Sequence, residues 1–265
     1  MNTMDLTKYD AILVNTSAGK DSQAMLDEIV RIAREQGVAA RVTAVHCDLG
    51  RMEWQGTREL AEEQCAAYGV PLRIVSRPQG NLLSQVEQRG KWPDSARRYC
   101  TSDHKRGQAA KVIVALHREW KARGGTGTFR LLSCMGLRAQ ESPARAKRVP
   151  FQRDDRLSTE TRVVDAWLPI HDWSTDQVWE RIRQSGVRHH RAYDLGMPRL
   201  SCCFCIFAPK AALVLAGKHN RELLDEYVAV EARIQHSFRQ HLSLAEVQEA
   251  VLADEQTDAV ASWTM

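Results

Sequence analysis

The sequence predicts an α/β fold: a doubly wound, mostly parallel sheet with helices on both faces and a helical C-terminal region. Short apolar runs typical of buried strands alternate with longer stretches of helical periodicity, which is the pattern of a parallel sheet. A turn of small residues, Ser17–Ser22, follows the apolar stretch Ala11–Val14 and precedes the first helical stretch. From Ala208 onward the pattern is helical alone. We therefore expect residues 1–207 to form one α/β domain and residues 208–265 a helical extension packed on it.

The expected strands are short and apolar, and they cover residues 11–14, 42–47, 72–75, 129–134 and 163–167. The expected helices cover residues 22–36, 57–68, 81–89 and 102–123, followed by 211–216, 221–240 and 244–253. Residues 139–161 are highly polar and contain Pro143 and Pro150, so we expect either a mobile lid over a site or a passive excursion. Ligands bind such sheets beyond the carboxyl ends of the strands. The loop ending in Ser17 and the segments after Cys47 and Cys134 should therefore converge.

The composition is that of a globular protein without membrane spans. Of the 265 residues, 43% are hydrophobic and 26% are charged, which is ordinary for a globular domain. No apolar run approaches the roughly 20 residues of a membrane helix. The first five residues lack the basic and apolar regions of a signal peptide. We therefore expect a cytoplasmic protein with no membrane partner.

The distribution of basic residues is more informative than the net charge of +4. Three clusters stand out: Arg97, Arg98, Lys105 and Arg106; then Arg138, Arg145, Lys147, Arg148, Arg153 and Arg156; then Arg188, His189, His190 and Arg191. Solvated surface charge is one explanation. Contacts with the phosphates of a nucleotide or a nucleic acid are the other.

The turn at Ser17–Ser22 has the chemistry of a phosphate site. A tight turn into a helix directs backbone N–H groups and the positive end of the helix dipole at one point. Ser17 and Ser22 add hydroxyl donors, Gly19 permits close approach, and Lys20 adds a mobile cation. The spacing is not that of a Walker loop, which needs four residues between its first glycine and the Gly-Lys pair. An ordinary capped strand-turn-helix is the structural alternative.

This run resembles the PP-loop of the adenine-nucleotide alpha-hydrolase superfamily, with Ala18 at the second position. Members of that superfamily cleave ATP between the alpha and beta phosphates and hold the released pyrophosphate in this loop. The resemblance implies catalytic roles for Lys20 and Asp21, with ATP and Mg²⁺ bound there. Asp48, at the end of the second expected strand, suits a contact with ribose, adenine or a magnesium-bound water, or a helix N-cap.

Further segments resemble the phosphoadenosine phosphosulfate reductase family. They are residues 99–106 around Cys100, residues 135–142 with Arg145 behind them, and residues 168–174. In the second of these, Gly136 would let the backbone approach the alpha phosphate, and Arg138 offers a planar donor fork for phosphate oxygens. Glu141 and Arg145 complete the nucleotide contacts that the resemblance implies. In the third segment Ser174 is interpreted as a helix cap.

The cysteines indicate a metal or cluster site. The chain has seven, an odd number in a sequence without a leader, which favours metal, cluster or redox chemistry over disulfides. Cys202 and Cys205 have the spacing of an iron–sulfur or zinc site. Together with Cys100 they resemble the cluster cysteines of sulfonucleotide reductases, although Tyr99 replaces the first member of the upstream pair.

Two readings of the fourth ligand remain open. Three cysteines hold a four-iron four-sulfur cluster with one iron open for sulfide, or Cys203 or Cys134 supplies the fourth thiolate. Zinc is the less favoured metal, and a pair of buried thiols without a metal is the structural alternative.

Family membership leaves the reaction open. A sulfonucleotide reductase uses a cysteine near its C-terminus as nucleophile, whereas here no cysteine follows Cys205. Residues 48–50 with Glu53 and Trp54, residues 99–101 and residues 193–196 together most resemble the ATP pyrophosphatases of DNA phosphorothioation (DndC and SspD type). The partners that this resemblance implies are DNA and a cysteine desulfurase. A sulfonucleotide reductase, a tRNA thiolase and a non-enzymatic nucleotide or redox sensor remain as alternatives, and self-association is left open.

Overall fold

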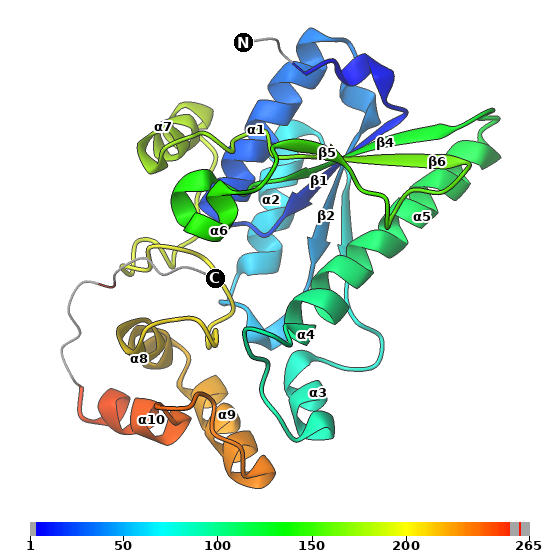
Figure 1. Ribbon diagram of the computed structural model, residues 1–265. Coiled ribbons are helices and arrows are strands. Elements are labelled where there is room, and N and C mark those ends of the chain that lie inside the picture. Colours follow the sequence, from blue (N-terminus) through cyan, green and yellow to red (C-terminus); the bar gives the residue numbers. More distant parts are fainter. Residues whose placement is uncertain (1–3, 255–259, 261–265) are drawn as a thin grey trace. The chain divides into compact units, whose positions relative to one another are not determined.

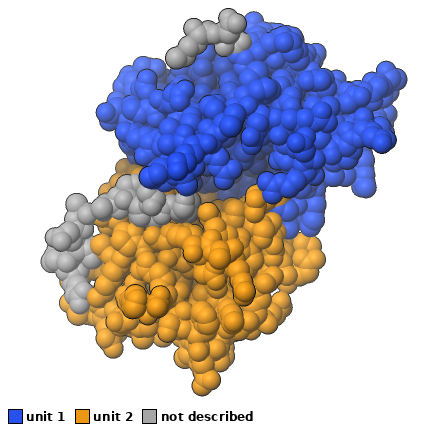
Figure 2. All heavy atoms as spheres, in the orientation of Figure 1, with its two compact units in different colours: residues 1–47, 58–75, 107–189 blue, residues 48–57, 76–106, 190–265 orange. Residues whose placement is uncertain are grey.

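The computed structural model describes residues 4–254 and residue 260, and the chain forms two compact units (Figure 2). The first unit comprises the residues up to 47 together with 58–75 and 107–189. The second comprises residues 48–57 and 76–106 and the chain from 190 onward. The expectations for residues 1–3 and for the end of the C-terminal extension, 255–259 and 261–265, lie outside the described residues.

A six-stranded sheet forms the centre of the first unit (Figure 1). Its strands are β1 (Ala11–Thr16), β2 (Val42–Cys47), β3 (Leu72–Val75), β4 (Phe129–Met135), β5 (Phe151–Arg153) and β6 (Arg162–Trp167), in the spatial order β3-β2-β1-β4-β6-β5. All neighbours pair in parallel except β5, which is antiparallel to β6 at the edge. The predicted doubly wound, mostly parallel sheet is confirmed.

Both faces of this sheet are covered by helices, and successive side chains of a strand point to opposite faces. In β1, Ile12 and Val14 pack on the face covered by α1 (Lys20–Glu35), α2 (Thr57–Tyr68) and α7 (Thr175–Ser185). Leu13 of the same strand packs on the opposite face, against α5 (Gly107–Ala122). Strand β1 is buried over almost its whole length because helices cover both faces of the sheet, as is typical of parallel sheets. The carboxyl ends of the parallel strands therefore form one edge at which ligands can bind.

The second unit is helical and has its own apolar core. Its helices are α3 (Leu82–Arg89), α4 (Tyr99–Thr101), α8 (Lys210–His219), α9 (Arg221–Ile234) and α10 (Leu244–Leu252), with a π-helical turn at Ser102–Arg106. Trp92 stacks on Tyr227 with ring centroids 5.3 Å apart and meets Phe238 edge-on at 5.2 Å. The predicted helical character of the C-terminal region is confirmed.

The unit boundary differs from the one expected between residues 207 and 208. Met52, Trp54, Trp92 and Tyr99 lie in the same core as the C-terminal helices, for example Tyr227. Burying apolar side chains in one core ties segments together wherever they fall in the chain. Three segments that sequence order assigns to the α/β domain, residues 48–57, 76–106 and 190–207, therefore group with the C-terminal helices.

Other local differences have clear physical causes. The segment 139–161 is not an irregular excursion, since it contains a 3₁₀ turn (Ala139–Glu141), α6 (Pro143–Ala146) and β5. The amide of Leu168 donates to Pro150 O at 2.8 Å and anchors this segment to the sheet. The helix expected over 102–123 becomes regular only at Gly107, after the π-helical turn. No helix in the described part of the chain has the length and apolar character needed to span a bilayer.

Candidate functional site

The loop between β1 and α1 is held in shape by its own side chains. Ser22 Oγ donates to the carbonyl of Gly19 at 2.9 Å and accepts from the amide of Ser17 at 3.1 Å. Ala18 adopts a left-handed φ of 56°, a conformation that costs a residue with a Cβ roughly 1 kcal/mol or more. Ser22 was expected to donate to a phosphate, but here its proton is used to brace the loop. Ser17 is the exposed hydroxyl of the pair.

Gly19 is the N-cap of α1, and no side chain caps this helix. The N-cap residue thus supplies no side-chain acceptor for the first-turn amides, which lack partners within the helix itself. A helix that begins in this way at the carboxyl edge of a parallel sheet is suited to binding an anion. Lys20, only 5% exposed, starts the helix.

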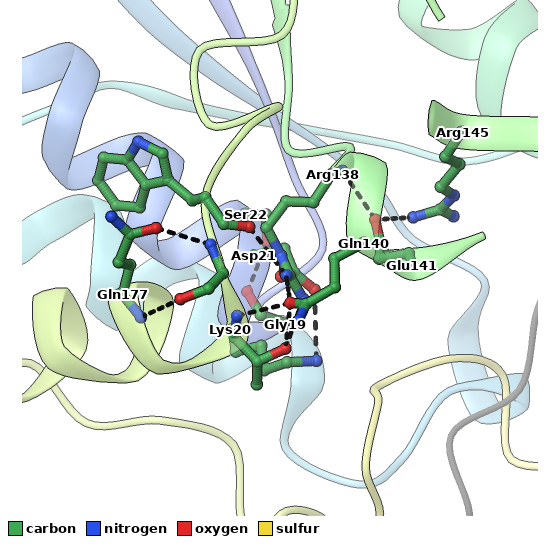
Figure 3. A network of polar contacts seen from close by, with 12 residues as sticks. Gly19, Lys20, Asp21, Ser22, Arg138, Gln140, Glu141, Arg145 and Gln177 are labelled. Atoms are coloured by element: carbon green, nitrogen blue, oxygen red, sulfur yellow. Dashed lines mark hydrogen bonds and ion pairs between the residues drawn. The ribbon is translucent and has the colours of Figure 1, made fainter. Parts of the chain in front are cut away.

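A row of charged side chains connects this helix to the segment after β4 (Figure 3). Asp21 lies between two cations: its Oδ2 is 3.4 Å from Lys20 Nζ, and its Oδ1 accepts from Arg138 Nε at 2.6 Å. The side chain of Arg138 is only 3% exposed. Removing one partner from a buried pair of this kind leaves an uncompensated charge. Asp21 thus fixes the position of both cations.

The guanidinium of Arg138 has partners on every nitrogen. Besides the Nε bond to Asp21, Nη1 donates to Gln140 Oε1 at 2.9 Å and to Trp173 O at 3.1 Å, and Nη2 donates to Thr175 Oγ1 at 3.3 Å. Arg138 was expected to donate to phosphate oxygens. In this structure its guanidinium donates to acceptors of the protein itself. These bonds link α1 to the start of α7 through Arg138, and a contact of Arg138 with a phosphate stays a prediction.

Gln140 and Thr175 are members of this network that the sequence did not reveal. Gln140 Oε1 also accepts from the amide and hydroxyl of Thr175, at 2.8 and 3.0 Å. The only sequence signal was the neighbouring Ser174, which does cap α7 as expected, accepting from Gln177 N. The capping motif identifies the helix start but not what the helix start binds.

Glu141 and Arg145, both expected to contact the nucleotide, also pair with each other. Glu141 Oε2 accepts from the backbone amide of Arg138 at 2.9 Å. The carbonyl of Arg145 is 3.1 Å from His171 Nε2. These contacts hold the segment after β4 in place, and the contacts of both residues with a nucleotide stay a prediction.

Gly136 packs directly against the start of α1. A Cβ at this position would lie 2.8 Å from Asp21 O, 2.9 Å from Asp21 C and 3.1 Å from Ser22 N. These are backbone atoms, which cannot rotate away. The expected reason for this glycine was close approach to a phosphate, whereas the structure shows a close approach of β4 to the helix that carries Lys20 and Asp21.

The candidate metal-binding cysteines lie in the second unit. Cys100 in α4, together with Cys202 and Cys205 after Ser201, are partly buried free thiols that pack against the core of this unit. Burial, partly offset by Lys105, raises the pKa of Cys202 to about 12. The pKa of Lys105 is itself raised, because the charges of neighbouring groups, Cys202 first, outweigh the effect of burial. The structure thus brings Cys100, Cys202 and Cys205 into one electrostatic neighbourhood.

The two candidates for a fourth ligand are placed differently. Cys203 is 1% exposed within the apolar core of the second unit, and its amide donates to Met52 O at 3.0 Å. Cys134 is in β4, fully buried in the core of the first unit. Burial raises the pKa of both thiols. Cys134 is therefore a core residue of the sheet, and a role of Cys134 or Cys203 as fourth ligand stays a prediction.

The spacing of the sulfur atoms bears on the kind of metal site. A mononuclear tetrahedral site with Zn–S bonds of about 2.3 Å would bring its thiolates within about 4 Å of one another. All seven cysteines lie in the described part of the chain. Among them, no group of three has its sulfur atoms within 4.8 Å of one another. A compact tetrahedral site built from three cysteines is therefore not formed among the described residues.

Asp48 lies in the second unit, in the turn that follows β2. Its Oδ1 accepts from the amide of Gly50 at 2.6 Å. This local bond stabilises the turn, as short acidic side chains commonly do. The expected helix N-cap is therefore replaced by a turn cap, and a contact of Asp48 with ribose, adenine or a magnesium-bound water stays a prediction.

Comparison with known protein families places the two residue sets in one family domain. The family described as the phosphoadenosine phosphosulfate reductase domain matches residues 11–208. The chain belongs to this family. The match begins at β1 and ends after Cys205, so it includes both the loop at Lys20 and the cysteine set.

Similar proteins are related only distantly to this phosphoadenosine phosphosulfate reductase family member. An uncharacterized 37.8 kDa protein of Escherichia phage 186 is 26% identical over 58% of this chain and 43% of its own length. An uncharacterized protein of Methanocaldococcus jannaschii is 24% identical over 73% of this chain and 36% of its own length. The chain thus spans about two fifths of the length of these curated relatives.

A solved structure of similar fold is that of the phosphoadenylyl-sulfate reductase from Candida auris in complex with phosphate. It is 18% identical and matches 74% of this chain and 83% of its own chain, with a TM-score of 0.47.

Replacing Gly136 with alanine should displace the loop at residues 17–22, where β1 leads into α1, called the phosphate loop below for its expected role. The added methyl group has no room beside the backbone of Asp21, and overpacking of this kind costs about 1–3 kcal/mol of stability. We expect a lower unfolding midpoint and weaker ATP binding, measured by thermal melting and calorimetric titration. Gly217→Ala is the matched control: its methyl group meets side-chain atoms of Val251 and Leu224 in the second unit. It should reduce stability without weakening ATP binding, and equal ATP affinity in the two variants would contradict the prediction.

The pKa of Lys20 predicts how phosphate binding depends on pH in this family member. Burial, and then repulsion from Arg138, lower the pKa of Lys20, although attraction to Asp21 offsets part of the shift. In the expected role of Lys20 its ammonium contacts a phosphate, and the charge of this group is lost as the pH rises through the lowered pKa. The affinity for ATP should therefore fall at a pH below the ordinary lysine pKa of about 10.4. Lys20→Arg keeps the charge, so its affinity should stay level over the same pH range; parallel decline in both proteins would exclude Lys20 as the titrating group.

Proposed function

We propose that this protein is an ATP pyrophosphatase that cleaves ATP to AMP and pyrophosphate and thereby activates a nucleic-acid group for sulfur insertion. DNA backbone phosphorothioation is the favoured reaction. The observation that carries this proposal is the row of charged side chains Lys20, Asp21 and Arg138 at the start of α1. Such an arrangement is suited to holding the phosphates of a nucleotide.

The reaction proposed for this loop is adenylyl transfer from ATP to the acceptor. An oxygen of the acceptor attacks the alpha phosphorus, and the bond from that phosphorus to the bridging oxygen breaks. Pyrophosphate leaves with the electron pair and is retained by the loop amides and Lys20. ATP enters as its magnesium complex, and catalysis rests on positioning and charge neutralisation. Sulfide then displaces AMP, which carries the acceptor oxygen away.

The cysteine set supports a sulfur-related reaction. Cys100, Cys202 and Cys205 would hold a four-iron four-sulfur cluster, with Cys203 kept in the apolar core. When bound, such a cluster supplies an iron without a protein ligand, at which sulfide can bind. Lys105, whose charge is favoured by the surrounding thiols and by Glu53, would offset the negative charge of the thiolates. A cysteine desulfurase is the proposed source of the sulfur.

The test compares two substrates on anaerobically purified protein. With ATP, a DNA oligonucleotide and sulfide, we expect AMP and pyrophosphate in equal amounts and sulfur in the DNA backbone. With adenylyl sulfate and a thiol reductant, we expect no sulfite. Sulfite without pyrophosphate would instead identify a sulfonucleotide reductase, and sulfur found only in added tRNA would identify a tRNA thiolase. ATP binding without cleavage would indicate a nucleotide sensor and contradict the proposal.

A further inference from the structure

One surface strip of the first unit is both basic and apolar. In the described residues, three large hydrophobic side chains are exposed, and two of them, Val149 at 56% and Phe151 at 43%, lie here. Lys147 and Arg148, which directly precede them, are also exposed. We call Lys147, Arg148, Val149 and Phe151 the 147–151 strip. Burial of apolar surface is favourable, so exposed aromatic residues beside cations indicate a binding surface.

The strip lies at the edge of the sheet that also carries the phosphate loop. Phe151 is in register with Trp167 of β6, Trp167 with Cys134 of β4, and Cys134 with Val14 of β1. The loop begins three residues after Val14. Three interstrand spacings of about 4.8 Å separate β5 from β1, roughly 14 Å in all. The strip is therefore on the same side of the unit as the proposed site of ATP cleavage.

The strip is held in place by its flanking contacts. Leu168 N donates to Pro150 O at 2.8 Å, and β5 pairs with β6 from Phe151 to Arg153 (Figure 1). On the other side, α6 is capped by Ser142, whose side chain accepts from Arg145 N. Lys147 and Arg148 follow this short helix directly. Their positions are thus fixed relative to the sheet rather than set by a free loop.

The charge of the strip indicates the chemistry of its partner. Residues 142–153 contain four basic residues, Arg145, Lys147, Arg148 and Arg153, and no acidic residue. Arg145 is paired with Glu141, and Arg153 with Asp155 at 3.3 Å. No acidic group among the described residues pairs with the side chains of Lys147 or Arg148. Two cations beside an exposed aromatic ring complement a phosphate backbone with unstacked bases.

We propose that the 147–151 strip binds the nucleic-acid substrate, with Lys147 and Arg148 on backbone phosphates and Phe151 stacked on a base. The inference rests on the proposed function in taking a nucleic acid as the acceptor, and it assigns the surface that presents this acceptor to the phosphate loop. The antiparallel edge strand β5 then has a functional role, since it places an aromatic ring at the carboxyl edge of an otherwise parallel sheet.

The experiment measures binding of fluorescein-labelled single- and double-stranded DNA to the full chain by anisotropy, at several salt concentrations. Lys147→Gln/Arg148→Gln should weaken binding by about tenfold and lower the salt slope by about 1.4 for single strands, which is about 0.7 for each lost phosphate contact. Phe151→Ala should weaken single-strand binding by about tenfold and duplex binding less. The matched control is Lys121→Gln/Arg156→Gln, which removes the same charge from exposed positions in α5 and beyond β5.

Equal weakening by the control pair, unchanged binding in the strip variants, or no DNA binding by the unmodified chain would each overturn the inference. Self-association that Phe151→Ala abolishes, with DNA binding intact, would also overturn it and identify β5 as a contact between copies. The affinity for ATP, measured on the same proteins by calorimetric titration, should be unchanged in the strip variants. Strip-dependent DNA binding without any ATP cleavage would reject the proposed function and leave this inference standing.

Discussion

Replacing Asp21 with asparagine is expected to lower the rate of ATP cleavage by at least about a hundredfold, the usual cost of misplacing a catalytic group by about 1 Å. Asparagine has nearly the same shape and can still accept from Arg138 Nε, but it carries no charge. Lys20 and Arg138 would then face each other across a neutral group, and Arg138 would stay buried without its carboxylate partner. The lost pairing should also cost up to about 3 kcal/mol of folding stability. Pyrophosphate release and denaturant unfolding measure the two effects.

Asp176→Asn provides the control for this substitution, because Asp176 is exposed in the first turn of α7. It should leave the rate of ATP cleavage unchanged and cost no more than about 0.5 kcal/mol of stability. The visible colour of the proposed iron–sulfur cluster should persist in both variants, because its proposed ligands Cys100, Cys202 and Cys205 lie in the other unit. Full ATP cleavage in Asp21→Asn would show that the carboxylate has no part in the reaction.

Replacing Cys202 with serine is expected to abolish iron–sulfur incorporation into anaerobically purified protein. A serine hydroxyl is a poor ligand for iron, and Cys202 is one of three partly buried thiols that share one neighbourhood. The protein should lose its brown colour and its broad visible absorbance, and iron analysis should fall to background. Cys100→Ser and Cys205→Ser should behave in the same way.

Two further cysteine variants make this prediction specific. Cys203→Ala should keep the cluster, because the side chain of Cys203 lies in the apolar core. Cys65→Ala, in the core of the first unit, should also keep it and lose only stability. Loss of colour in Cys203→Ala with the fold intact would show that four cysteines hold the cluster. Retained colour in Cys202→Ser would contradict the assignment of the whole set.

Much of the fold follows from local patterns. The strands β2 and β3 have the bounds expected from their apolar runs, and β1 extends only two residues beyond its expected end. Strand β5 could not be predicted, because its three residues are all exposed and its extended form comes from pairing with β6. The unit boundaries differ from the expected boundary at 207/208 for a similar reason. Trp92 and Tyr227 pack in one core, but no local pattern in the sequence around either residue indicates that they meet.

The sequence by itself determined the family and the parallel sheet and supplied the candidate residues for the chemistry, because apolar runs, turn chemistry and cysteine spacing are local properties. Only the tertiary structure decided how those residues are used. It paired Arg138 with Asp21, 117 positions away, placed Gly136 against the backbone of the same helix, and put Cys134 in the apolar core of the first unit. Contacts between residues so far apart are set by packing of the sheet and its helices, and packing leaves no periodic pattern along the chain.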